Sequence, residues 1–274
     1  MTSKHLQILL FNFLLLAQFT VHSQEKERCN CPQLSKTGKG TFYFSWGYNK
    51  DYFSQSDIHL KDEGADNYNF TLHDVKAKDR PGFNQILSTT LAVPQYVYRL
   101  GYYFNNSKDL GIEINFDHTK YVMINNQVVR LSGQIKGKEY DQDTLVTPDF
   151  LKFEHTNGAN FLMINLLKRK TLVTSGNKKH WLSVVVKPGA GIVIPKTDVT
   201  LFGERLDNKF HIAGYIVGLE AGLRYDLFKY AFLEFTGKGS FADYRDVLVI
   251  GTGKAKHHFF TQEFILTAGF QFPL

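Results

Sequence analysis

Two short segments of the chain combine a carboxylate, a histidine and a threonine in the same order. They are Asp-His-Thr at residues 117–119 and Glu-His-Thr at residues 154–156. A histidine beside a carboxylate can act as a general base, and it can activate a hydroxyl group or a water molecule for attack on an ester. The candidate catalytic residues are therefore Asp117, His118, Glu154 and His155.

The elements that must position these residues are most regular between residues 210 and 274. Three segments there alternate apolar residues with polar or small ones at a period of two. Successive side chains of a strand point to opposite faces, so each segment has one apolar and one polar face. The apolar faces comprise Ala213, Tyr215, Val217, Leu219, Ala221, Leu223 and Tyr225, then Ala231, Leu233, Phe235 and Phe241, then Phe260, Phe264, Leu266, Ala268, Phe270 and Phe272.

The opposite faces of these segments carry charges of both signs beside glycines. This pattern is typical of a barrel whose outside contacts lipid and whose inside is polar. Residues 267–274 also resemble the C-terminal signal by which outer-membrane barrels are recognised for insertion, with Leu274 in place of the usual final aromatic residue. The sequence thus predicts an all-β fold, a transmembrane antiparallel up-and-down β-barrel over residues 40–274.

The number of strands depends on one short segment. If residues 54–61 cross the membrane, periplasmic termini require about ten strands; if they belong to an extracellular hairpin, the number is eight. Long connections at 120–148, 197–208 and 246–256 are expected outside the cell, with 120–148 as the longest irregular stretch. The other alternating segments are residues 41–49, 68–76, 95–104, 112–117, 150–167 and 182–194.

The N-terminus has the features of a cleaved signal peptide over residues 1–23. Lys4 precedes an apolar run at 8–19, which is too short to span a membrane. Residues 24–39 are then expected to form a periplasmic tail. Its Cys29 and Cys31 are interpreted as a disulfide or as free thiols, because the segment offers too few ligands for a metal site.

Charged residues on the polar faces are expected to fill the barrel. Both signs occur, which favours pairing within the lumen over a selective pore lined by one sign of charge. An interior of eight to ten strands is little wider than the side chains that line it. The predicted inward set is Arg99, Glu113, Asp117, Lys187, Glu220, Arg224, Glu234, Lys238 and Glu263.

The two histidine segments fall at the ends of strands expected to be neighbours, so His118 and His155 are predicted near the extracellular rim, on the lipid-facing side. Residues 154–160 resemble the His-x-Ser-Asn motif of the outer-membrane lipid A deacylase family, in which a barrel-surface histidine and serine cleave an acyl chain. The resemblance covers seven residues, and Asn157 stands where the family has its serine. It implies a role for His155, oriented by Glu154, in hydrolysis of a lipid acyl ester.

The chain as a whole resembles the small bacterial outer-membrane β-barrel proteins, and this implies location in the outer membrane after export. The sequence favours a structural or interaction role through the extracellular loops over catalysis, with a lipid-ester hydrolase or a narrow transport barrel as alternatives. The expected partners are outer-membrane lipids, the barrel-assembly machinery during insertion, and an unidentified extracellular or envelope partner. We expect no nucleic acid, cofactor or metal.

Overall fold

The computed structural model describes residues 39–64, 67–82, 94–105 and 109–274, and its regular elements are all β-strands. Among these residues, no helix is long and apolar enough to cross a membrane. The signal peptide at 1–23 and the tail with Cys29 and Cys31 lie outside the described residues, apart from Lys39 at the end of the tail, and they stay predictions.

Eight strands form a closed antiparallel ring, in which β17 pairs back onto β1 from Thr41↔Pro273 to Phe53↔Thr261. The closed ring confirms the predicted fold class, with the alternative count of eight rather than ten. In order around the ring, the strands are β1 (Thr41–Phe53), β5 (Tyr96–Asn105), β6 (Leu110–His118), β11 (Phe161–Thr174), β12 (His180–Val193), β15 (Gly214–Leu227), β16 (Ala231–Leu248) and β17 (Lys254–Pro273).

The remaining strands lie at one end of the ring. There β2 (Ser56–Asp62), β3 (Tyr68–Val75), β8 (Gln127–Ile135) and β9 (Lys138–Val146) extend the barrel sheet beyond β17. The count of ten was wrong because β2 belongs to this extension. A second sheet has the order β14 (Glu204–Asp207), β13 (Asp198–Leu201), β10 (Leu151–His155), β7 (Tyr121–Met123) and β4 (Ala77–Asp79).

Two connections expected to be irregular are strand-rich. Residues 120–148 contain β7 and the β8–β9 hairpin, and residues 197–208 contain β13 and β14. Their polar composition suggested loops, but each strand hydrogen-bonds to a neighbour, and most polar side chains of β9 and β14 are exposed. These strands belong to a second structured region, which we call the β-sandwich. It consists of the sheet extension β2, β3, β8 and β9 and of the five-stranded sheet β14, β13, β10, β7 and β4.

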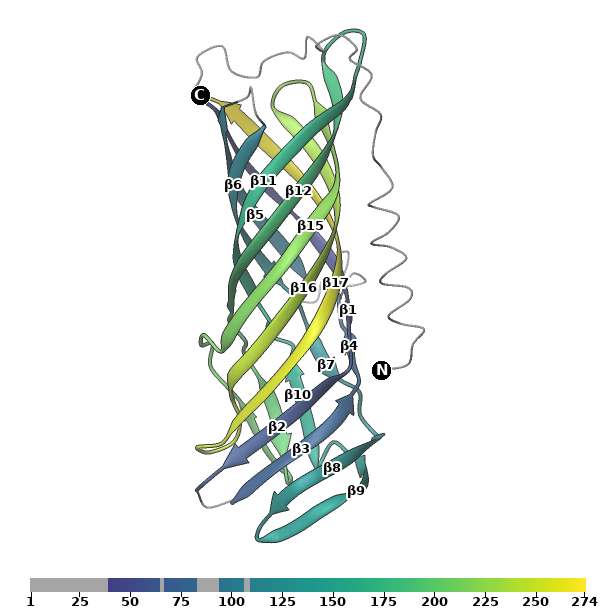
Figure 1. Ribbon diagram of the computed structural model, residues 1–274, viewed down its shortest axis with the longest axis vertical. Helices are drawn as coiled ribbons and strands as arrows, with labels where there is room; N and C mark the ends of the chain where they lie inside the picture. Colours follow the sequence, from purple (N-terminus) through teal and green to yellow (C-terminus); the bar gives the residue numbers. More distant parts are fainter. Residues whose placement is uncertain (1–38, 65–66, 83–93, 106–108) are drawn as a thin grey trace, which may run out of the picture. The chain divides into compact units, whose positions relative to one another are not determined.

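The two ends of the ring differ in their connections (Figure 1). At one end the β5–β6, β11–β12 and β15–β16 connections are short, and the C-terminus lies there too. At the other end lie the connections that build the β-sandwich. We call these the inner and the outer end of the barrel. Short turns beside the termini and long connections opposite are the arrangement of outer-membrane barrels.

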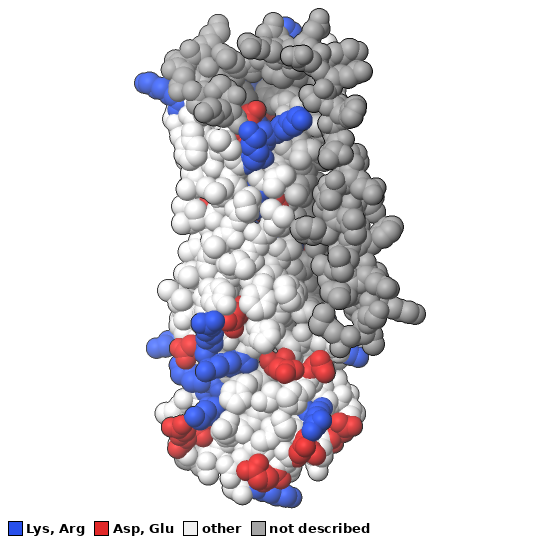
Figure 2. Space-filling model, viewed as in Figure 1, with Lys and Arg blue, Asp and Glu red and all other residues white. Residues whose placement is uncertain are grey.

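The outside of the ring is an apolar belt. Along β17, Phe260 and Phe272 are 66% and 53% exposed, and they bound a row of outward apolar residues. Strands rise roughly 3.3 Å per residue and tilt by roughly 40° in barrels, so residues 260–272 span about 30 Å, the thickness of a bilayer core. One face of the molecule has few charged residues over its middle (Figure 2).

The polarity of β16 and β17 inverts near the outer end. On β17 the inward side chains change from Glu263 and Thr261 to Phe259, while the outward ones change from Phe260 to His258 and Lys256. The inside is thus polar where the outside is apolar, and apolar where the outside is polar. We infer that lipid surrounds the strands up to about residue 260 and water beyond it.

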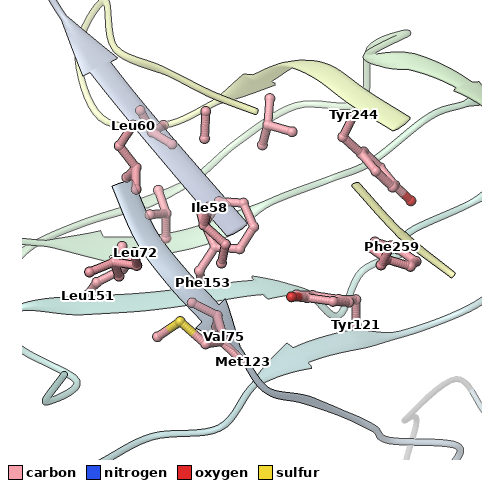
Figure 3. Close-up of a cluster of buried hydrophobic side chains, with 14 of the residues drawn as sticks. Ile58, Leu60, Leu72, Val75, Tyr121, Met123, Leu151, Phe153, Tyr244 and Phe259 are labelled. Carbon is pink, nitrogen blue, oxygen red and sulfur yellow. The ribbon is translucent and has the colours of Figure 1, made fainter. Parts of the chain in front are cut away.

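The β-sandwich has an apolar core between its two sheets (Figure 3). Side chains from β2 and β3 meet others from β7 and β10, and Phe259 and Tyr244 reach the core from the barrel strands β17 and β16. Stacking of Tyr121 on Phe259, with ring centroids 5.0 Å apart, joins the second sheet to the barrel. The β-sandwich and the barrel are therefore packed as one unit.

Candidate functional site

The barrel interior holds all nine charged residues that were predicted to face inward. Each is at most 4% exposed, which confirms their inward orientation. The four cations are Arg99, Lys187, Arg224 and Lys238, and the five carboxylates are Glu113, Asp117, Glu220, Glu234 and Glu263.

Lys187 of β12 connects carboxylates from three other strands. Its Nζ lies 3.1 Å from Glu113, 3.2 Å from Glu220 and 2.5 Å from Glu234. Arg99 bridges a similar set, with its guanidinium 3.7 Å from Glu113 and 3.3 Å from Glu220. Each of the two cations thus fixes strands from opposite parts of the ring.

Asp117 and Arg224 organise the outer and inner parts of this network. The Asp117 carboxylate forms ion pairs with both Arg99 and Lys238. The Arg224 guanidinium lies 3.4 Å from the ring centroid of Phe232 and 3.1 Å from the Asp226 carboxylate. Asp226 was absent from the predicted inward set, although its parity with Arg224 along β15 would have indicated it.

Aromatic and glycine residues complete the packing of the interior. Tyr43 donates a 2.5 Å hydrogen bond to Glu113, and its ring covers Gly101, where a Cβ would lie 2.2 Å from the ring. Gly269, within the C-terminal signal, is covered in the same way by Phe232, at 2.3 Å. Eight-stranded barrels are just wide enough for side chains to fill. The interior is therefore filled by paired charges and packed aromatic side chains.

The histidine of the first candidate catalytic segment is placed by aromatic stacking. His118, 7% exposed, stacks on Tyr96 with ring centroids 4.7 Å apart, and its Nδ1 lies 2.8 Å from the Asn160 side-chain oxygen. Asp117 faces the opposite way, into the ion-pair network. The carboxylate and the histidine of this segment therefore do not act on each other.

The histidine of the second segment lies inside the molecule. His155 is fully buried, with its Nε2 3.1 Å from the Nε2 of His257 and its Nδ1 3.1 Å from the Thr197 hydroxyl. Its ring stacks on Tyr244 at 5.2 Å. The expectation that His155 faces lipid was wrong, because β10 lies in the β-sandwich, where alternate residues such as Phe153 face an apolar core.

The two segments lie on neighbouring parts of the chain, as expected, but their side chains have different partners. The strand β6, which carries Asp117, pairs with β11, and β10, which carries Glu154 and His155, pairs with β7 directly after the first segment. Glu154 forms ion pairs with Arg80 at 3.3 Å and with Lys152 at 3.4 Å. Catalysis by Asp117, His118, Glu154 and His155 stays a prediction, and a buried His155 imidazole does not favour it.

His257 received no role from the sequence, yet its ring nitrogen contacts that of His155 directly. Both rings lie among Tyr121, Phe153 and Tyr244 at centroid distances of 4.7–5.8 Å. Strand parity could have indicated the inward orientation of His257, because it alternates in step with Glu263. Burial lowers the pKa of His155 to about 3, with a smaller effect from His211. The imidazole is therefore neutral at pH 7.

The β8–β9 hairpin is the part of the β-sandwich best placed for contact with another molecule. Among the described residues, β9 is the terminal strand of the twelve-stranded sheet and pairs with β8 alone. Val128 and Leu145 are paired across the hairpin and are 65% and 53% exposed. A free strand edge beside an exposed apolar pair is a recognised means of binding an extended segment.

No protein-family model and no curated protein matches the chain. Solved structures with a similar course of the chain include Ail, the attachment invasion locus protein of Yersinia pestis, at 13% identity and a TM-score of 0.33, covering 85% of this chain and 99% of that one. OprG from Pseudomonas aeruginosa is 12% identical with a TM-score of 0.40, and the match covers 86% of this chain and 98% of OprG. Neisserial surface protein A is 11% identical with a TM-score of 0.33, and the match covers 86% of this chain and 100% of that protein. These TM-scores are too low to support an argument, so the fold assignment depends on the strand pairing described above.

Replacing Lys187 by Met should destabilise the barrel strongly. The substitution leaves the buried Glu113 and Glu234 without their shared cation, and breaking a buried ion pair costs about 3–5 kcal/mol. The urea midpoint of the protein folded into lipid vesicles should fall accordingly. Lys170→Met, on the exposed face of β11, is the matched control, and an equal midpoint for the two variants would contradict the role of Lys187.

The β-sandwich should lose stability in acid. The pKa of a histidine in the unfolded chain is about 6.5, whereas that of folded His155 is about 3. Between these two pH values only the unfolded chain binds the proton, and this stabilises the unfolded state. The free energy of unfolding should fall by up to about 1.4 kcal/mol per pH unit within this window and stay constant above it. The effect is measured as the temperature at which a protease begins to cleave the β-sandwich, compared between pH 7.5 and pH 4.5.

His155→Phe keeps a stacking ring but cannot take up the proton, so the difference between the two pH values should shrink. His180→Phe, in the first residue of β12 at the inner end, should leave it unchanged. An undiminished difference in His155→Phe would show that other groups control the acid response.

Proposed function

We propose that this protein is a bacterial outer-membrane barrel that anchors the β-sandwich outside the cell and binds a partner through the β8–β9 hairpin. The observation that carries the proposal is the exposed Val128–Leu145 pair on the hairpin, beside the free edge of β9. Contiguous apolar patches and open strand edges are usually avoided on surfaces without a partner.

The membrane location is supported by the surface of the ring. An apolar belt about 30 Å tall surrounds an interior of paired charges, the reverse of a water-soluble protein. The short turns at the inner end and the C-terminal signal favour periplasmic termini and delivery by the barrel-assembly machinery. In this orientation the lipids of the outer membrane surround the belt, and the β-sandwich projects outward.

The filled interior argues against transport. Lys187 and Arg99 with their carboxylates connect strands across the lumen, and a pore would instead need an open, hydrated path. We therefore expect no steady conductance when the purified protein is inserted into planar lipid bilayers. Sustained openings in recordings at both polarities would support the narrow transport barrel and contradict this part of the proposal.

The acidic side chains along β9, beyond the basic turn with Lys136 and Lys138, favour a basic partner. β9 carries Glu139, Asp141 and Asp143, and Arg130 of β8 pairs with Asp141 at 2.7 Å. Asp143 has no ion pair among the described residues. An extended segment with basic side chains could pair with the edge of β9 and place an apolar side chain against Leu145.

Photo-crosslinking in living cells of the native host tests this proposal. A photoreactive residue at Leu145 should give a discrete protein adduct, and Asp143→Lys in the same chain should reduce its yield several-fold because it reverses the charge offered to the partner. Glu204→Lys, on the exposed β14, makes the same charge change away from the hairpin and should have no effect.

The same photoreactive residue at Ile114, 48% exposed on the belt, controls for adducts formed within the membrane. Absence of a protein adduct at Leu145, or a yield insensitive to Asp143→Lys, would contradict the hairpin as the binding surface.

A further inference from the structure

Four basic side chains meet on the outward face where β2 pairs with the outer end of β17. The strand register places Lys254 opposite Lys61, and Lys256 opposite His59. Residues directly opposite in an antiparallel pair have Cβ atoms about 5 Å apart, and like charges at such positions destabilise the sheet. These four residues line a groove of about 350 Å³.

The acidic residues of the groove neutralise it in part. Glu63 pairs with Lys61 at 2.6 Å but is 80% exposed, and Asp246 pairs with Lys254 at 2.8 Å. Asp62 also lines the groove; it is 6% exposed and accepts a 2.6 Å hydrogen bond from the Thr252 hydroxyl.

Lys256 remains without a carboxylate. No ion pair includes it in the part of the chain that the structure describes, and it stands opposite His59. The His59 ring, about half-buried, has its Nδ1 3.0 Å from the Thr71 hydroxyl. Its burial, together with Lys256 and Lys61, lowers the pKa of His59. Lys256 therefore adds a positive charge to the groove with which no carboxylate of the described residues pairs.

The groove lies just beyond the apolar belt. Lys256 is four residues from Phe260, the last outward aromatic residue of β17, which corresponds to about 13 Å along the strand and about 10 Å in height for a tilt of roughly 40°. Flexible lysine side chains can reach several ångströms toward the membrane while their charge stays in water. Figure 2 shows Lys and Arg side chains gathered on this side of the nearly uncharged middle region.

We propose that this groove binds the phosphate group of an outer-leaflet lipid headgroup. A phosphate monoester carries a charge of about −1.5 to −2 and three acceptor oxygens, so one group can accept hydrogen bonds from Lys61, Lys254 and Lys256 together. The bound anion would balance the charge of Lys256 and add to the ion pairs that Lys61 and Lys254 already form. The site depends on the proposed outer-membrane orientation but not on the β8–β9 hairpin.

The test measures lipid binding to the full-length mature protein in a neutral detergent. Native mass spectrometry compares lipid A with its dephosphorylated form, and inorganic phosphate is titrated separately by ³¹P line broadening. Lipid A should bind at least several-fold more tightly than the dephosphorylated lipid. Lys256→Gln should weaken lipid A binding about five-fold, because a lysine near an anionic surface contributes about 1 kcal/mol.

Lys229→Gln, in the turn between β15 and β16 at the inner end of the barrel, removes the same charge at the end away from the groove and should leave binding unchanged. Equal binding of the two lipids, or equal weakening by both variants, would overturn the site. If inorganic phosphate binds as tightly as lipid A and Lys256→Gln weakens it, the lipid source is overturned and free phosphate is the ligand. The heat-modifiable band of each variant on gels verifies that the barrel is folded.

Discussion

The pairing of buried charges inside a closed ring is the constraint on which the rest of the structure depends. With the outside of the barrel facing lipid, polar side chains can only point inward, where an unpaired charge would be very costly. Lys187 and Arg99 meet this constraint by contacting carboxylates from several strands. The same contacts join strands across the ring and occupy its interior, so one set of ion pairs both stabilises the barrel and fills it.

Two long strands connect the lipid-embedded barrel with the β-sandwich. β16 and β17 continue beyond the belt, and their inward side chains change from Lys238 and Glu263 to Tyr244 and Phe259. The backbone hydrogen bonds continue without interruption while the solvent outside changes from lipid to water. Through β2 and β3 this sheet also connects the β8–β9 hairpin to the barrel, and it places the basic groove just beyond the end of the apolar belt.

The buried histidines take their character from the β-sandwich rather than from the membrane. His155 and His257 contact each other among aromatic rings, and their neutral form suits that apolar core. A carboxylate next to a histidine in sequence is therefore no evidence of a working pair. Glu154 and Asp117 both point away from the histidine that follows them, because successive side chains of a strand face opposite sides.

The sequence by itself determined the barrel, its apolar belt and the nine inward charges, because a period of two and a polar inner face are local properties of each strand. It could not determine where lipid ends. The inversion of polarity near Phe260, the strands within residues 120–148 and the burial of His155 depend on which segments pair outside the membrane. Only the tertiary structure decides that pairing. The alternating pattern is the same around Phe116, which faces outward, and Phe153, which faces the apolar core, so the sequence does not distinguish the two environments.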